Sequence, residues 1–276
     1  MSKKGKCRLT IDSPIISLLT DFGLKDPYAA EMKAVILSLC PNARIIDITH
    51  LIEKFNVRTG AFVLASATPY FPKGTIHVAV IDPEVGTKRR ALLMETEEAF
   101  YIGPDNGVLV LAAKKQKVKH VYSITNKQYL LRKVSHTFHG RDVFAPAAAH
   151  LANGCRPDDF GPEIRDYLVP EFAEPQLKQN KLTGQVLHID DFGNIITNIV
   201  KDQLEKMGAN QGSKLRIKLA KKVIAIRLGS AYDEVKAKTA LALIGSHDFL
   251  EISMNQSNAS KRLKSKIGDD VTLSLF

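Results

Sequence analysis

The chain has 276 residues, of which 45% are hydrophobic and 25% charged, a composition typical of ordinary globular proteins. A single hydrophobic core seldom organises so long a chain, so we expect two domains. No stretch approaches the roughly 18 apolar residues of a membrane span, and no signal-peptide pattern is present, which favours a cytoplasmic protein without membrane contact.

The net charge is +10, with a pI near 9.4. The charge is spread over short clusters such as 114–119 and 261–266, and the chain has no tryptophan to form a stacking platform for bases. We therefore expect solvated basic faces and no nucleic-acid partner. Cys7, Cys40 and Cys155 are far apart, so neither a disulfide framework nor a CxxC site is expected.

The first half of the chain alternates between strand and helix patterns. Residues 1–13 are expected to form a flexible basic tail, and residues 14–155 an α/β domain. The expected elements are a strand at 15–20, a helix opened by Asp26 and Pro27 and ending at Leu39, a strand at 44–49, a helix from Asn56 to about 68, strands at 75–81, 91–96 and 99–102, a helix at 108–113, and a helix at 143–152 capped by Asp142. This alternation predicts a mostly parallel sheet with helices on both faces.

The pattern changes in the second half. Residues 156–182 carry four prolines among many charges, which predicts an extended linker. Strand patterns follow at 183–189, 214–219, 223–228, 240–244, 250–254 and 271–276, interrupted by one short helix at 202–207. Many short strands with Gly and Asn or Asp turns predict a small antiparallel β-barrel over residues 183–276.

Polar side chains follow three expected strands, namely Asp21, His50 and Asp82. In an open α/β sheet, ligands bind beyond the carboxyl ends of the strands, although each of these residues alone is as well explained as a turn former. A carboxylate such as Asp21 suits the hydroxyl pair of a ribose. Because neither GxGxxG nor GxxxxGK[ST] is present, a nucleoside without a gripped phosphate chain fits this pattern.

A histidine lies just before an expected helix, in the motif 138–142. It serves either as a helix-entry residue or as a functional group that titrates near neutrality. Asp82, Arg89 and His139 together would suit the binding and polarisation of a water molecule, since a carboxylate-oriented histidine is a common base arrangement. The same donor types would also suit a metal, but no HxH or HExxH spacing is present, and we expect no metal.

Five segments occur in an order that resembles a known family. They are residues 19–23 with Asp26, 82–90, 103–107, 137–142 with 145–147, and 189–194. Together they resemble the S-adenosylmethionine hydrolase family, also called the S-adenosylmethionine hydroxide adenosyltransferase family, whose halide-using relatives are fluorinase and chlorinase. The resemblance spans roughly residues 14–276. It implies an N-terminal α/β domain, a C-terminal β-barrel, and a homotrimer whose sites lie at subunit interfaces.

The resemblance also implies a role for individual residues. Asp82, Arg89 and His139 correspond to the water-activating triad, with Arg89 stabilising developing hydroxide while Asp82 and His139 orient or deprotonate the water. The implied substrate-binding residues are Asp21 at the ribose diol, Phe55 as an aromatic wall, Tyr232 against adenine, Asn194 with Phe192 at adenine, Asp190 at the methionine ammonium, and Ser246 near the methionine end.

Two departures from the family pattern concern loops. Glu84 stands where the family usually has glycine, and Gly245-Ser-His-Asp248 replaces a more usual Asn-Ser-x-Gly, which leaves His247 as a candidate at the methionine carboxylate.

The implied reaction is attack of water at the ribose C5′ of S-adenosylmethionine, giving adenosine and methionine without a further cofactor. Halide transfer to the same carbon is the first alternative, but the halogenases have a tyrosine in place of the triad aspartate and lack its histidine. A metal-dependent nucleotide hydrolase and a non-enzymatic nucleic-acid binder are the others.

Overall fold

The computed structural model describes residues 13–276, which divide into two compact units at the Leu168–Val169 peptide bond. The predicted N-terminal tail, apart from Ser13, lies outside the described residues. The boundary falls inside the segment 156–182: its first part belongs to the first unit, and its remainder belongs to the second. No helix in the described part of the chain is long and apolar enough to cross a membrane.

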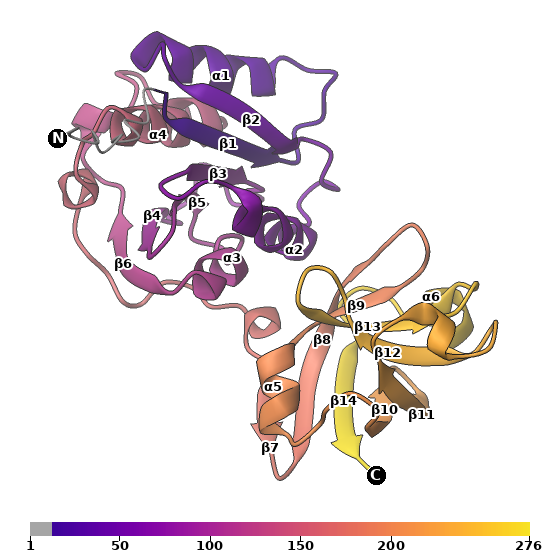
Figure 1. Ribbon diagram of the computed structural model, residues 1–276. Coiled ribbons are helices and arrows are strands. Elements are labelled where there is room, and N and C mark those ends of the chain that lie inside the picture. The colour runs from indigo at the N-terminus through magenta and orange to yellow at the C-terminus, as the bar shows by residue number, and fades with distance from the viewer. Residues whose placement is uncertain (1–12) are drawn as a thin grey trace, which may run out of the picture. The chain divides into compact units, whose positions relative to one another are not determined.

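The first unit is a six-stranded sheet with helices on both faces (Figure 1). Its main elements are β1 Ile15–Thr20, α1 Tyr28–Leu39, β2 Arg44–Thr49, α2 Val57–Ala67, β3 Ile76–Val80, β4 Ala91–Thr96, β5 Phe100–Pro104, α3 Val110–Lys115, β6 Val118–Ser123 and α4 Ala145–Ala152. The strand order is β2-β1-β3-β5-β4-β6. The pairs β1–β2, β1–β3 and β3–β5 are parallel, while β4 runs antiparallel to β5 and β6. The predicted α/β fold is confirmed, with an antiparallel edge added.

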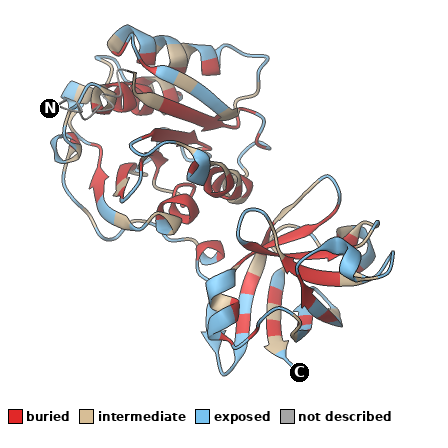
Figure 2. Ribbon diagram, in the orientation of Figure 1, coloured by how far each residue is buried: buried red, intermediate tan, exposed pale blue. Residues whose placement is uncertain are grey.

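The centre of this sheet brings two predicted site residues to one edge. All five residues of β3 are buried, and β1 is buried from its second residue onward (Figure 2). The two strands are parallel neighbours, and Thr20 pairs with Val80 in the register. Asp21 and Asp82 therefore leave adjacent strands at the same carboxyl edge of the sheet.

Two helix starts differ from the sequence prediction. The cap position of α1 is Pro27, and no side chain caps it, so Asp26 is not the cap. Helix α4 begins at Ala145, and Asp142 lies within a wider π-helical turn, Gly140–Phe144. The buried carboxylate of Asp142 accepts a hydrogen bond from the Ser135 backbone N–H at 2.8 Å, which ties it to the preceding loop.

The second unit is a closed β-barrel with two short helices (Figure 1). Its elements are β7 Gln176–Lys178, β8 Lys181–Ile189, β9 Ile195–Val200, α5 Lys201–Lys206, β10 Lys214–Leu219, β11 Lys222–Gly229, β12 Ala240–Ile244, β13 Phe249–Met254, α6 Ala259–Leu263 and β14 Asp270–Leu275. Seven strands close into the barrel because β14 pairs with both β8 and β10. Only the β11–β12 pair is parallel among the barrel pairs described, so the predicted barrel is confirmed.

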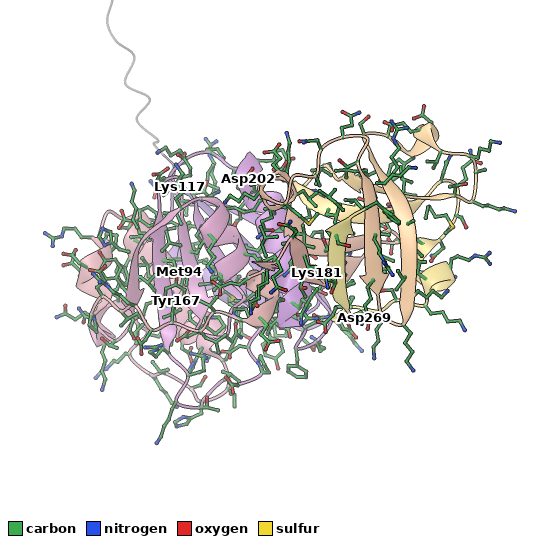
Figure 3. All side chains as sticks on the ribbon, turned by 90° about the horizontal axis from the view of Figure 1, so that it is seen from below. Met94, Lys117, Tyr167, Lys181, Asp202 and Asp269 are labelled. Atoms are coloured by element: carbon green, nitrogen blue, oxygen red, sulfur yellow. The ribbon has the colours of Figure 1, made fainter. Side chains whose placement is uncertain are left out.

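Strands β6, β7 and β9 and helix α6 were missed from the sequence, and β7 lies within the segment predicted to be a linker. In β9, Thr197 and Asn198 resemble turn residues, but both are buried. The Thr197 hydroxyl donates to the Leu250 carbonyl, and the Asn198 amide donates to the Phe172 carbonyl, each at 2.9 Å. Strand β6 is exposed in its first half and follows Lys117, whose side chain is 77% exposed, so it lacks a continuous apolar pattern. Met94 on the neighbouring strand β4 is only 1% exposed (Figure 3).

Buried His77 on β3 makes the first unit sensitive to acid. The Ser17 hydroxyl lies 2.6 Å from its Nδ1 atom, and the rings of Phe71 and Tyr101 pack against the imidazole. Burial lowers the pKa of His77 from 6.5 to about 3. The unfolded state therefore binds more protons between these two values, so the stability that neutral His77 preserves at neutral pH is lost as the pH falls below about 6.5.

We predict that the free energy of unfolding falls by about 1.4 kcal/mol per pH unit below about pH 6 because of this residue alone. A Ser17→Ala/His77→Phe double variant keeps an aromatic ring, leaves no unpaired hydroxyl, and should lose this part of the pH dependence. Urea unfolding near pH 7 and near pH 5 measures both proteins. An equally steep pH dependence in the double variant would contradict the assignment.

Candidate active site

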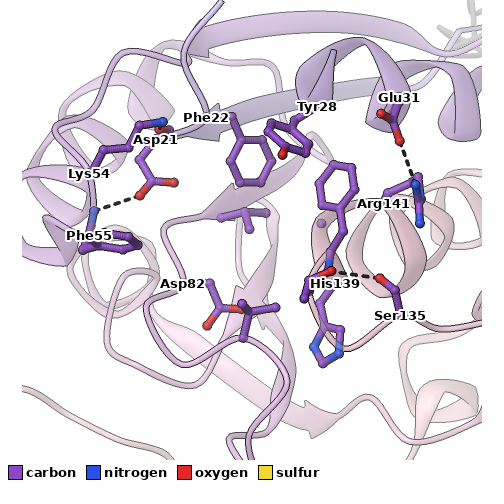
Figure 4. Close-up of a pocket in the computed structure, with 15 residues that line it drawn as sticks. Asp21, Phe22, Tyr28, Glu31, Lys54, Phe55, Asp82, Ser135, His139 and Arg141 are labelled. Atoms are coloured by element: carbon purple, nitrogen blue, oxygen red, sulfur yellow. Dashed lines mark hydrogen bonds and ion pairs between the residues drawn. The ribbon is translucent and has the colours of Figure 1, made fainter. Parts of the chain in front are cut away.

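A cavity of about 550 Å³ opens where β1 and β3 end. Asp21 follows β1, Asp82 follows β3, and His139 precedes the π-helical turn at the start of α4. All three residues line the cavity, and Figure 4 shows their side chains around it. Residues that are far apart in the sequence therefore meet at the sheet edge where the parallel topology predicts a ligand.

Arg89 joins the other two members of the predicted triad. Its Nε atom lies 3.0 Å from both carboxylate oxygens of Asp82, and its Nη2 atom lies 2.7 Å from Nδ1 of His139. The side chains of Arg89 and Asp82 are only 4% and 5% exposed. The guanidinium also lies 5.3 Å from the centre of the Phe144 ring, a cation–π distance. Arg89 is thus held behind Asp82 and His139.

This contact fixes the tautomer of His139. A guanidinium has donors and no acceptor, so Nδ1 of His139 must accept, and the neutral ring then carries its proton on Nε2. Burial first, and the charge of Arg89 second, lower the pKa of His139, and Asp82 and Asp142 oppose them only in part. The imidazole is therefore neutral near pH 7, with Nε2–H as its only donor.

Asp21 is held on the opposite wall of the cavity by the segment before α2. One carboxylate oxygen accepts from the Phe55 backbone N–H at 2.8 Å, and the Asp21 carbonyl accepts from the Lys54 ammonium. Phe55 has a φ of +64°, which is uncommon for a residue with a side chain. Its ring is 65% exposed beside the cavity, where a flat ligand group can pack against it.

Other cavity residues were missed from the sequence. The rings of Phe22, Tyr28 and Phe138 pack edge to face or tilted, with centres 5.1 to 5.7 Å apart. Glu31 accepts from Arg141 at 2.8 Å, and the Arg141 guanidinium lies 5.1 Å from the Phe138 ring centre. Tyr28 and Glu31 are three residues apart on α1 and so share a helix face. This three-residue spacing is the feature of the sequence from which a shared position for Tyr28 and Glu31 could have been predicted.

The remaining predicted residues lie on the barrel. The Asp190 carboxylate accepts from the backbone N–H of Asn194 at 2.8 Å and from its side-chain amide at 2.9 Å. The Tyr232 hydroxyl donates to Glu251 at 2.7 Å, and burial, Glu251 and then the nearby charge of Asp190 raise the pKa of Tyr232. The structure therefore brings Asp190, Asn194 and Tyr232 together. Phe192 beside them is 81% exposed.

The loop that departs from the family pattern also belongs to this group. Ser246 and His247 follow β12, after Gly245. A Cβ atom at Gly245 would lie 2.9 Å from a carboxylate oxygen of Glu251. A larger residue there would displace Glu251, which is the physical reason that glycine suits this sequence.

The cation that contacts both Asp82 and His139 is the guanidinium of Arg89, which lies behind the cavity. Among residues 13–276, no group of three or more His, Cys, Asp or Glu side chains is placed to hold a metal ion.

Two family patterns match the chain in succession. The N-terminal domain of SAM hydroxide adenosyltransferases matches residues 16–161, and the C-terminal domain matches residues 184–272. The chain belongs to the SAM hydroxide adenosyltransferase family.

Several known proteins resemble the chain over nearly its whole length. An (R)-S-adenosyl-L-methionine hydrolase from Methanocaldococcus jannaschii is 39% identical, with 94% of this chain and 95% of that protein covered. A crystal structure of a conserved protein from Thermotoga maritima is 38% identical, with a TM-score of 0.82 and coverage of 94% and 99%. A fluorinase from Nocardia brasiliensis is 28% identical over 94% and 96%. Of these two enzymes, the fluorinase therefore has the lower sequence identity to this chain.

We predict opposite shifts in the pKa of His139 when its two neighbours are changed. Arg89→Met removes the charge that lowers this pKa, so the pKa should rise, whereas Asp82→Asn removes a charge that raises it, so the pKa should fall. An NMR titration of the histidine ring signals measures both variants and the wild type. Shifts of the same sign in the two variants would contradict the arrangement.

Proposed function

We propose that this protein hydrolyses S-adenosyl-L-methionine to adenosine and L-methionine by attack of water at the ribose C5′. The observation that carries the proposal is the bridge from Asp82 through Arg89 to His139, of which Asp82 and His139 line the same cavity as Asp21. Asp21 would accept hydrogen bonds from the ribose hydroxyls, as carboxylates do in α/β nucleoside sites. The name of the relative from Methanocaldococcus jannaschii supports the same activity.

In this mechanism, one water molecule lies on the cavity side of Asp82 and His139, away from Arg89. The Nε2–H of His139 donates to the water oxygen, and Asp82 accepts one water proton, because each carboxylate oxygen can accept a second bond beside that from Arg89. The water oxygen forms a bond to C5′ while the C5′–S bond breaks. The electron pair of the C5′–S bond passes to sulfur, so methionine leaves as a neutral thioether. The extra proton leaves the new hydroxyl through Asp82 to solvent.

Most of the rate enhancement in this proposal comes from alignment. The sulfonium leaving group needs no protonation, so the protein has to hold a nucleophile opposite the C5′–S bond and exclude competing water. Arg89 contributes from behind the water site: it holds the carboxylate and the imidazole at a fixed separation and keeps His139 neutral.

Water is favoured over halide by the charge on Asp82. A carboxylate at the nucleophile position repels a bare chloride or fluoride ion, but it accepts a hydrogen bond from a protic nucleophile.

We further propose a homotrimer in which the barrel residues of a neighbouring subunit complete each site. The supporting observation is the division of the predicted binding residues: Asp21 and the triad belong to the first unit, whereas Asp190, Asn194 and Tyr232 belong to the second. The free cysteines Cys40 and Cys155 support a reducing compartment, consistent with the predicted cytoplasmic location.

We predict that the oxygen of the 5′-hydroxyl comes from solvent. The purified protein is incubated with S-adenosylmethionine in ¹⁸O-water with abundant chloride and with a chelator, and the nucleoside is weighed by mass spectrometry. Labelled adenosine and unlabelled methionine are expected, at an unchanged rate when the chelator is present. Unlabelled adenosine, or 5′-chloro-5′-deoxyadenosine as the main product, would overturn the proposal, and loss of activity with the chelator would favour a metal-dependent hydrolase.

We also predict complementation between two defective chains. Asp82→Ala should lower turnover by about 10²–10⁴-fold, and Asp190→Ala should weaken substrate binding. When the two chains are co-expressed with different tags and mixed oligomers are purified, some sites combine an intact first unit with an intact barrel, and activity returns in part. The matched control combines Asp82→Ala with His139→Ala, in which every first unit is defective. Recovery in the control, or none in the test pair, would count against shared sites.

A further inference from the structure

The turn at residues 103–107 takes no part in the proposed chemistry, yet it lies beside the loop that carries the triad pair. In the sheet order β3-β5-β4, strand β5 separates the strands that the loop 82–90 connects. The loop therefore crosses the carboxyl end of β5, and that end is the turn 103–107. Ala91, the first residue after the loop, pairs with Pro104 of this turn.

Asn106 holds the start of the crossing loop. Its side-chain amide donates to the carbonyl of Ile81 at 2.7 Å, and Ile81 is the residue directly before Asp82. Its side-chain oxygen accepts from the backbone N–H of Val108 at 3.2 Å. One side chain therefore ties the end of β3 to the turn.

Asp105 holds the other end of the loop. Its backbone N–H donates to the Arg90 carbonyl at 3.0 Å, and its carboxylate accepts from Nε of Arg90 at 2.9 Å. The second carboxylate oxygen accepts from the backbone N–H of Leu168 at 2.8 Å. The Asp105 side chain is only 7% exposed, so this anchor is largely shielded from water. Arg90 is the residue directly after Arg89.

The tip of the loop contacts the segment that carries His139. Gly86 has a φ of +80°, and a Cβ atom there would lie 2.2 Å from the carbonyl oxygen of His136. Only glycine permits so close an approach of the two backbones. The crossing loop is therefore fixed at its two ends by Asn106 and Asp105 and at its tip by the backbone before His139.

We propose that Asp105 and Asn106 are positioning residues for this reaction: they fix the separation of Asp82 and Arg89, and through Arg89 they hold the contact with His139. The inference rests on the proposed hydrolysis and names residues that act on it indirectly. Displacement of a reacting group by about 1 Å can cost about 100-fold in rate, so anchors of this kind have measurable kinetic effects.

Two variants test the proposal with opposite changes of charge. Asn106→Asp keeps the acceptor for Val108 but places an oxygen against the Ile81 carbonyl, and it adds a negative charge. Asp105→Asn keeps the acceptor for Leu168, weakens the hold on Arg90, and removes a negative charge. If either anchor is loosened, Arg89 should move away from Nδ1, and the pKa of His139 should rise because the Arg89 charge lowers it.

We expect kcat to fall by about 10–100-fold in both variants, while KM changes little. The acid limb of the kcat–pH profile should move to higher pH in both, because a higher pKa means that His139 takes up its Nδ1 proton at a higher pH. A purely electrostatic effect would instead move the limb in opposite directions in the two variants, which would overturn the proposal.

The matched control is Asn126→Asp. Asn126 likewise donates to a backbone carbonyl, that of Asp159 at 2.9 Å, and accepts from the backbone N–H of Gln128 at 3.1 Å, but it does not line the cavity. The Asn126→Asp variant should have the wild-type kcat and the wild-type pH profile of kcat. Wild-type kinetics in both test variants would refute the positioning role but leave the proposed hydrolysis standing. A wild-type protein that forms no adenosine would refute the proposed function itself. A lowered melting temperature with normal kcat would show a merely structural role, and would also overturn the inference.

Discussion

The site depends on one interaction: the guanidinium of Arg89 contacts both the Asp82 carboxylate and the His139 imidazole. Its contacts through Nε and Nη2 with the carboxylate of Asp82 and its contact with Nδ1 of His139 use the planar arrangement of donors that only arginine provides. A buried cation of this kind needs partners on every side, and Asp82, His139 and the Phe144 ring supply them. The chemistry at the cavity is therefore set by a residue that does not line it.

The fold explains why this arrangement is rigid. Two parallel strands, β1 and β3, deliver Asp21 and Asp82 to the same edge, and the crossing of β5 by the loop 82–90 brings Arg89 back beside Asp82. The antiparallel β4 is essential here, because it starts at the edge where β3 ends and so allows a nine-residue loop to carry both members of the ion pair. The sheet topology thus determines the geometry of the active site.

Much of this could be predicted from sequence, and the failures have physical causes. Polar residues after apolar strands located Asp21 and Asp82, and alternation predicted strands such as β10, whose side chains alternate between exposed and buried. Strand β9 was missed because buried Thr197 and Asn198 satisfy their polar groups through distant backbone carbonyls, which a local pattern cannot reveal. The capping role assigned to Asp142 failed similarly, since its carboxylate is committed to Ser135. The role of Arg89 behind the cavity, the tautomer of His139 and the anchoring by Asp105 and Asn106 all require contacts between segments that only the folded chain brings together.

The most direct test of this account is the tautomer of His139 in the wild-type protein. Long-range ¹H–¹⁵N NMR of protein labelled with ¹⁵N-histidine distinguishes a protonated ring nitrogen from an unprotonated one, and Arg89→Met identifies the His139 signals. At a pH above the His139 pKa, the account predicts a proton on Nε2 and a bare Nδ1 that accepts from Arg89. A proton on Nδ1 in the neutral ring would contradict it, because Arg89 and His139 would then present two donors to each other.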